Sequence, residues 1–213
     1  MTNIIDGKEI ASQLRAEIKK KVDKLSPKPG LAFILVGKDP ASQVYVNSKH
    51  KACEEVGIKS KVIELKETTN VGDILQTIED LNEDKNIHGM IVQLPLPEGI
   101  NKDLVIDAIL PYKDADGLSP VNIGALFADQ PRIIPATPSG IIKLIKSTGQ
   151  KIAGKNAVVL GRSTMVGKPT AALLLKENAT VTVCHSKSKN TKEMCRNADI
   201  IVAAIGKPKF VTK

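Results

Sequence analysis

Apolar and polar positions follow two different periods along this chain, which predicts alternating helices and strands. Apolar side chains recur every three or four residues over 8–25, with lysines on the other face, and so predict an amphipathic helix. The continuous apolar run from Leu31 to Val36, which ends at Gly37, predicts a strand buried on both faces. The same criteria predict further helices at 41–56, 71–81 and 103–110, and further strands at 61–65 and 87–94.

The second half of the chain begins with a different composition. Residues 111–140 are rich in Pro, Gly and Asp and predict loops, short helical turns and a boundary between domains. Thr137 suits the N-cap, and Pro138 the first position, of a helix that ends at Gly149. Strands at 157–160, 180–183 and 200–205 then alternate with helices at 168–177 and 190–197. This order predicts one mononucleotide-binding half of a doubly wound fold. We therefore expect an α/β protein with largely parallel sheets in two α/β domains, residues 1–138 and 139–213.

Composition excludes several classes of protein. Hydrophobic residues make up 42% of the chain and charged residues 25%, which excludes disordered and collagen-like sequences. The longest apolar runs, Leu31–Val36 and Ile200–Ile205, are far shorter than the ~20 residues of a membrane span. Asp6, Lys8 and Glu9 interrupt the N-terminus before a signal-peptide core forms. Three cysteines do not make a disulfide framework, so we expect a reducing, cytoplasmic compartment and no membrane partner.

The net charge of +8 favours anionic ligands, whether nucleic acids, phosphorylated cofactors or polycarboxylates. The chain has only three Phe, two Tyr and no Trp, whereas single-stranded nucleic acids are usually bound on aromatic platforms. Small anions are therefore the expected ligands, and nucleic acid is not an expected partner.

The segment Gly161–Pro169 follows a predicted strand and precedes a helix, where backbone N–H groups bind phosphates. It lacks the usual G-x-G-x-x-G spacing. It is not a Walker A loop, because five residues separate Gly161 from Gly167 and Pro169 replaces Ser or Thr. Met165 also excludes a G-x-S-x-G nucleophile elbow. We interpret the segment as a cofactor loop; an ordinary turn between strand and helix is the alternative.

The next predicted strand ends without the acidic residue that binds the ribose of NAD. Ser186, Lys187 and Arg162 could instead hold a 2′-phosphate, which favours NADP. His185 and Cys184 are adjacent, so their side chains point to opposite faces of a strand and do not form a metal site. We expect His185 to be a positioned or solvent-facing residue and predict no metal.

Three segments in the first half carry candidate chemistry. Tyr45 and Lys49 are spaced to share a helix face, and partial burial would let the lysine act as a general acid or base. Gln93 lies at the carboxyl end of a predicted strand, where ligands of α/β sheets bind. Asp116 precedes Gly117 in a loop, where a carboxylate can accept paired N–H groups from a heterocycle. The alternatives are a surface lysine, an edge glutamine and a simple turn.

These motifs, in this order, resemble the bifunctional methylenetetrahydrofolate dehydrogenase/methenyltetrahydrofolate cyclohydrolase family over essentially the whole chain. The resemblance rests on Y-V-x-x-K, V-Q-L-P-L-P, K-D-x-D-G, P-x-T-P-x-G, G-R-S-x-x-V-G-x-P and A-D-I-x-V-x-A-x-G-K-P. It implies an N-terminal folate-binding catalytic domain, a Rossmann-like NADP-binding domain and an active site in the cleft between them. It also implies a cytoplasmic homodimer that acts on tetrahydrofolate derivatives in one-carbon metabolism, which serves purine, methionine and histidine biosynthesis.

The resemblance assigns roles to individual residues. It implies that Lys49 is the general acid/base, that Tyr45 positions the folate, that Gln93 tunes Lys49, and that Asp116 with Gly117 binds the pterin ring. For the cofactor, the residues implied are Gly161, Arg162, Ser163 and Ser186.

The chain also departs from the family pattern. Ala136 replaces a cysteine of P-C-T-P, and Ala115 replaces the valine of K-D-V-D-G, both of which we expect to be tolerated. The P-G-G-V-G-P-M-T segment and a final helix, which follow in family members, do not occur before Lys213. On this basis we expect an incomplete cofactor domain, lower stability and a weakened dehydrogenase step. Two other functions stay open: a folate-binding fragment with impaired catalysis and a basic nucleic-acid-binding module.

Overall fold

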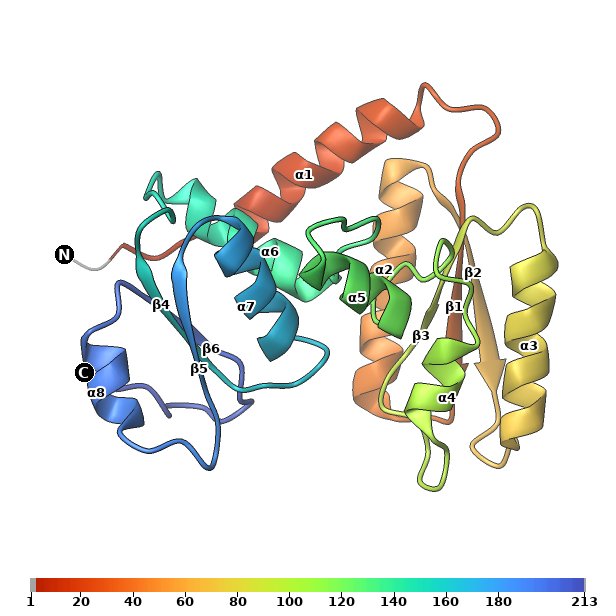
Figure 1. Ribbon diagram of the computed structural model, residues 1–213. Coiled ribbons are helices and arrows are strands. Elements are labelled where there is room, and N and C mark those ends of the chain that lie inside the picture. The colour runs from red at the N-terminus through yellow and green to blue at the C-terminus, as the bar shows by residue number, and fades with distance from the viewer. Residues whose placement is uncertain (1–2, 213) are drawn as a thin grey trace. The chain divides into compact units, whose positions relative to one another are not determined.

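The computed structural model describes residues 3–212, which form two compact units, each with a three-stranded parallel sheet (Figure 1). The first unit is Asp6–Pro120. The second comprises residues 3–5 and 121–212. The sequence-based boundary lies after residue 138, whereas the compact units divide after residue 120.

The first unit is a parallel sheet covered by helices. Its central strand, β1, pairs with β2 on one side and β3 on the other, as Leu31 opposite Ser60 and Gly89 illustrates. The parallel pairing predicted from the sequence is confirmed. The elements in chain order are α1 (Gly7–Val22), β1 (Gly30–Val36), α2 (Pro40–Val56), β2 (Lys59–Leu65), α3 (Val71–Glu83), β3 (Gly89–Val92) and α4 (Lys102–Asp107).

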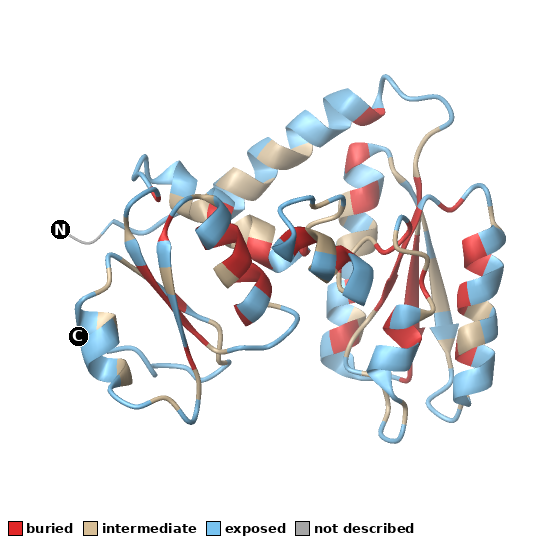
Figure 2. Ribbon diagram, in the orientation of Figure 1, coloured by how far each residue is buried: buried red, intermediate tan, exposed pale blue. Residues whose placement is uncertain are grey.

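Strand β1 is buried on both faces, which explains its continuous apolar run. Ala32 and Ile34 pack against α3 and α4 in one core, whereas Phe33 and Leu35 pack against α2 in another. Figure 2 shows the buried residues along the sheet and on the inner faces of these helices. The second of these cores fixes α2, which carries Lys49, on one face of the sheet.

The second unit repeats the arrangement of a central strand between two others. The sheet order is β5-β4-β6, with all pairs parallel. Val159 packs with helices α6 and α7 on one face, and Leu160 packs beside Cys195 on the other. The elements are α5 (Pro120–Phe127), which begins at the division between the units, α6 (Ala136–Ser147), β4 (Asn156–Leu160), α7 (Gly167–Lys176), β5 (Thr180–Cys184), α8 (Thr191–Arg196) and β6 (Ile200–Ala203).

The start of α6 corrects one prediction. The helix begins at Ala136, its N-cap is Pro135, and no side chain caps it, so the prediction of Thr137 as N-cap was wrong. Pro138, predicted at the first position, is the third residue of the helix; it fits there because the first N–H groups of a helix have no partner within it.

The strand orders define where ligands of such sheets bind. Both sheets have the order second-first-third, whereas a mononucleotide-binding half has the order third-second-first. In each sheet, therefore, the second strand is added on one side of the first strand, and the third strand is added on the other side. Ligands of open α/β sheets bind at this change of side, outside the carboxyl ends of the strands. In the first unit Gln93 follows β3 at this place, and in the second unit Gly161 follows β4.

Candidate active site

Lys49 and Gln93 meet at the carboxyl edge of the first sheet. Lys49 lies on α2 and is half-buried, and Gln93 follows β3 directly. The Lys49 Nζ donates a hydrogen bond of 3.1 Å to the Gln93 Oε1, and the Gln93 Nε2 donates one of 2.7 Å to the Leu94 carbonyl. The Gln93 backbone N–H bonds to the Ile34 carbonyl at 2.9 Å, which fixes this residue to the end of the sheet. The amide of Gln93 therefore holds the lysine ammonium in one direction.

Asp116 reaches the same edge on a loop that continues the sheet. The Met90 N–H donates to the Lys113 carbonyl at 2.7 Å, and the Ala115 N–H to the Met90 carbonyl at 3.1 Å, which forms a parallel bridge between Met90 and Asp114. The chain then turns, with the Gly117 N–H donating to the Asp114 carbonyl at 3.1 Å, and Asp116 lies in this turn.

The buried carboxylate of Asp114 shapes the loop around Asp116. It accepts hydrogen bonds from the Gly117 N–H at 2.9 Å and the Ser119 N–H at 2.8 Å. The Gly117 N–H is thus committed to the loop itself. Sequence reasoning assigned no role to Asp114, although an aspartate that begins a turn three residues before a glycine is a signal for this geometry.

The electrostatic environment of Asp116 joins it to Lys49. Burial raises the pKa of the Asp116 carboxyl; the Lys49 charge lowers it, and the Asp114 charge raises it further. The structure therefore brings together Lys49, Gln93 and Asp116. Tyr45 lies one turn before Lys49 on α2 and is 63% exposed. An ammonium, an amide, a half-buried carboxyl and an exposed ring together can bind a polar heterocycle and move protons.

A cavity of about 500 Å³ lies at the carboxyl ends of the strands in the second unit. Gly161 and Ser186 line it, whereas Arg162 and Ser163 are outside its lining. Lys207 also lines it, and sequence reasoning missed this residue although it follows the last strand in Gly-Lys-Pro. The lining contains no carboxylate, which suits an anionic ligand. It consists of Leu160, Gly161, Cys184, His185, Ser186, Ser188, Thr191, Ile205, Lys207 and Phe210.

The loop between β4 and α7 requires glycine at both ends. Gly161 has φ +113°, and a Cβ on it would lie 3.0 Å from the Ala204 carbonyl carbon. A Cβ on Gly167 would lie 2.6 Å from the Gly161 carbonyl carbon and 2.9 Å from the Arg162 nitrogen. The Ser163 Oγ accepts hydrogen bonds from the Val166 and Gly167 N–H groups at 3.2 and 3.3 Å. This tight turn at the start of a helix fits the phosphates of a dinucleotide.

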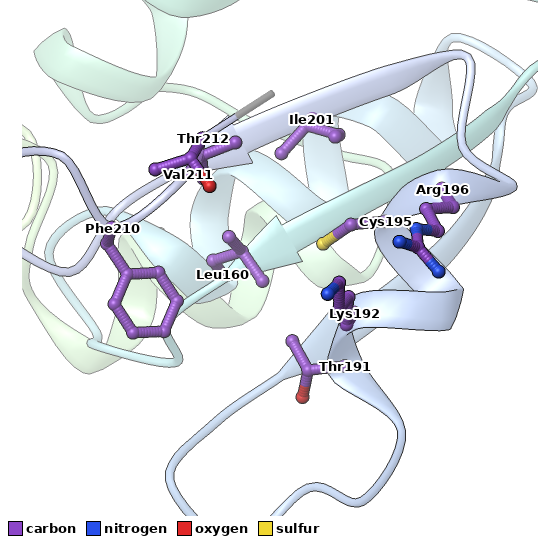
Figure 3. A pocket seen from close by; sticks show the side chains of 9 residues that line it. All are labelled: Leu160, Thr191, Lys192, Cys195, Arg196, Ile201, Phe210, Val211 and Thr212. Atoms are coloured by element: carbon purple, nitrogen blue, oxygen red, sulfur yellow. The ribbon is translucent and has the colours of Figure 1, made fainter.

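A second hollow of about 620 Å³ adjoins this cavity, with which it shares Leu160, Thr191 and Phe210 (Figure 3). Figure 3 shows Lys192, Cys195 and Arg196 on α8 on one side and residues 210–212 on the other. Its lining contains two cationic side chains and no carboxylate. The positive charge therefore extends beyond the first cavity.

His185 is held by its own loop. Its backbone N–H donates to the Ser188 Oγ at 2.9 Å, and its Nδ1 accepts from the Lys187 N–H at 3.2 Å. Within residues 3–212, no group of three His, Cys, Asp or Glu residues is arranged to hold a metal ion. No helix in this part of the chain combines the length and apolar composition of a membrane span.

The fold and these two sites define an α/β protein with two sites on different sheets. One is the Lys49-Gln93-Asp116 cluster, and the other is an anion cradle formed by the loop from Gly161 to Gly167. The model of the tetrahydrofolate dehydrogenase/cyclohydrolase catalytic domain matches residues 5–116, and that of the family's NAD(P)-binding domain matches residues 135–213. The bifunctional protein FolD of Agathobacter rectalis is 54% identical over 99% of this chain and 77% of its own length. That of Listeria innocua is 52% identical over 100% of this chain and 76% of its own length.

Solved structures agree with these matches. The FolD dehydrogenase/cyclohydrolase of Campylobacter jejuni superposes with a TM-score of 0.92 at 44% identity, over 95% of this chain and 73% of that one. The Trypanosoma brucei enzyme, solved with NADP cofactor and inhibitor, gives 0.93 at 38% identity, over 97% and 73%. The chain belongs to the tetrahydrofolate dehydrogenase/cyclohydrolase family.

Proposed function

We propose that this chain oxidises 5,10-methylenetetrahydrofolate to 5,10-methenyltetrahydrofolate with NADP⁺ and hydrolyses the product to 10-formyltetrahydrofolate. The observation that carries the proposal is the hydrogen bond of Lys49 to Gln93, with Asp116 beside them, at the edge where ligands of such sheets bind. Membership of the family supports both reactions, because its relatives are described as bifunctional dehydrogenase/cyclohydrolases.

NADP⁺, when bound, accepts a hydride from the methylene carbon and becomes NADPH. The residues of the second unit fit such a cofactor: Gly161 and Gly167 let the loop fold tightly at the start of α7, where backbone N–H groups bind phosphates. Ser186, at the cavity, and Arg162, on the adjoining loop, would bind the 2′-phosphate, and Ser163 would shape the loop. Their role in the oxidation is to bind and orient, since hydride transfer needs no protein base.

Lys49 would carry the proton transfers of the hydrolysis. A water oxygen bonds to the methenyl carbon and gives up a proton to the Lys49 amine. The bond from this carbon to N5 then breaks as N5 takes a proton from the Lys49 ammonium, and the second water proton goes to solvent. The product is the 10-formyl compound, and Lys49 is returned to its starting state.

The other residues of the cluster would hold the substrate for this transfer. The Gln93 carbonyl fixes the direction of the Lys49 Nζ, and its amide is fixed in turn by the Leu94 carbonyl. Asp116, with the turn at Gly117, would accept N–H groups of the pterin ring. The exposed Tyr45 ring would lie against the folate one helical turn from Lys49.

Reduction of the cofactor tests the proposal. The chain is mixed with methylenetetrahydrofolate and either NADP⁺ or NAD⁺, and reduced nicotinamide is followed by absorbance. We expect kcat/KM to be at least about tenfold higher with NADP⁺, equivalent to ~1.4 kcal/mol. Absence of reduction with both cofactors would contradict the dehydrogenase proposal, and a preference for NAD⁺ would contradict the assignment of Ser186.

Family membership also leads us to propose a homodimer in the cytoplasm that supplies one-carbon units for purine, methionine and histidine biosynthesis. Sedimentation equilibrium tests the first part: we expect twice the 22.9 kDa of one chain. A single species of monomer mass at micromolar concentration would contradict it.

A further inference from the structure

Lys113 is a buried lysine whose partners are all backbone carbonyl groups. The residue is 7% exposed, and its Nζ donates to the carbonyls of Leu81 at 2.8 Å, Asn82 at 2.7 Å and Asp84 at 2.9 Å. None of the ion pairs among residues 3–212 includes it. The three protons of the ammonium therefore match three acceptors at one place, the carboxyl end of α3.

Helix α3 needs a cation at this end and does not supply one itself. Its last turn contains no basic residue, and Asp80, Glu83 and Asp84 add negative charge there. The last carbonyl groups of a helix lack partners within it and carry the negative end of its dipole. Lys113 reaches this end across 29 to 32 residues of sequence. Its ammonium thus caps a helix to which it does not belong.

The cap joins α3 to the loop that carries Asp116. The Lys113 carbonyl accepts the Met90 N–H, and the next residue, Asp114, holds Gly117 and Ser119. The side chain of Lys113 is therefore anchored on α3 while its backbone begins the loop. Asn82 makes a second connection between α3 and the segment that leads to this loop. Its Nδ2 donates to the Ala108 carbonyl at 2.9 Å, and its Oδ1 accepts the Leu110 N–H at 3.2 Å.

We propose that Lys113 is a positioning residue of the folate site: by capping α3 it fixes the 113–119 loop and holds the Asp116 carboxylate beside Lys49. This inference rests on the proposed function of that site. Lys113 itself does not touch the substrate; its effect passes through Asp116. Loss of the cap would leave the ordered α3 carbonyls without donors and free the loop to move.

The test is Lys113→Met, which keeps the length of the side chain and removes its donors. We expect the KM for methylenetetrahydrofolate to rise at least about tenfold, while the KM for NADP⁺ stays unchanged because the cofactor cavity is in the other unit. A general loss of folded protein would instead lower the apparent kcat and leave both KM values unchanged, which would overturn the proposal.

Lys28 offers a matched control in the same unit. Its Nζ donates to the Val22 carbonyl at the end of α1 at 2.8 Å, so Lys28→Met also removes an ammonium from a helix end. Lys28 precedes β1 and so lies at the opposite end of the sheet from Gln93. We expect this variant to melt at a slightly lower temperature with no change in either KM. An equal rise in folate KM for both variants would overturn the proposal.

A double-mutant cycle tests whether Lys113 acts through Asp116. If it does, adding Lys113→Met to Asp116→Asn raises the folate KM no further than Asp116→Asn alone. Independent, multiplied effects would overturn the proposal.

Hydrogen exchange separates this proposal from the proposed function. Exchange at the Gly117 and Ser119 amides, which donate to Asp114, needs no substrate. We expect Lys113→Met to accelerate it relative to amides of β2, and unchanged exchange would overturn the positioning role. Acceleration in a chain that neither binds nor converts folate would support the tie while refuting the proposed function. If Lys113→Met yields no folded protein, Lys113→Gln, which keeps two donors without the charge, is measured in the same way.

Discussion

Replacing Gly167 with alanine tests the cofactor cradle with one added methyl group. The new Cβ would lie 2.6 Å from the Gly161 carbonyl carbon, 2.9 Å from the Arg162 nitrogen, and closer still to the Gly161 carbonyl oxygen. These neighbours are backbone atoms, so they cannot yield by a change of rotamer. Helix α7 and the loop must separate, and overpacking of this kind costs about 1–3 kcal/mol. At roughly 2–4 °C per kcal/mol for a chain of this size, we expect the melting temperature to fall by roughly 2–12 °C.

Gly140 provides a matched control for this substitution. It lies inside α6 in the same unit, and a Cβ there would meet nothing within 4 Å. Gly140→Ala should stabilise the protein by about 0.5–1 kcal/mol, because alanine favours a helix interior.

Thermal melting and titration with NADP⁺ measure both variants. We expect Gly167→Ala to weaken binding at least about tenfold, equivalent to ~1.4 kcal/mol, and Gly140→Ala to leave the Kd unchanged. Wild-type stability and affinity in Gly167→Ala would refute the close approach of loop and helix on which the cradle depends.

Two further predictions concern single polar groups. Asp116→Asn should raise the free energy of unfolding near neutral pH, because burial raises the carboxyl pKa above its ordinary value of 3.8. At pH values between 3.8 and the higher pKa of Asp116 in the native protein, the native protein binds more protons than the unfolded chain. The stability of the wild type relative to the variant therefore falls as pH rises through that window. Urea unfolding at several pH values measures this, and the opposite slope would show a carboxylate stabilised in its charged form. Ser186→Asp should raise the KM for NADP⁺ at least about tenfold and lower that for NAD⁺, because the new carboxylate repels a 2′-phosphate and accepts a ribose hydroxyl. An unchanged KM for NADP⁺ in steady-state kinetics would place the 2′-phosphate elsewhere.

The fold was predictable from the sequence where burial is strong and local. The run Leu31–Val36 identified β1 because that strand is covered on both faces. The strand orders were not predictable in the same way, because they depend on which distant strands pair. Helix α5 lies in a stretch rich in Pro and Gly that predicted loops and short helical turns, and Leu126 anchors it in the core of the second unit.

Residues of the candidate site were predictable where a short stretch of sequence by itself indicates a functional role. Lys49 and Gln93 each stood at a position typical of chemistry, but only the fold shows their hydrogen bond. Asp116 was found as a loop carboxylate, whereas Lys113 gave no local signal, since its partners on α3 lie about 30 residues away. Long-range ties of this kind come from packing and not from a motif.

Hydrolysis of methenyltetrahydrofolate tests the central claim most directly. The loss of its absorbance is followed with the wild-type chain, with Lys49→Met, and with Lys51→Met, which removes an exposed lysine from the same helix. The account predicts that the wild-type chain and Lys51→Met accelerate the decay over buffer, and that Lys49→Met does not. Equal rates in all three proteins, or no acceleration by the wild-type chain, would contradict the assignment of Lys49 as the acid/base of a cyclohydrolase.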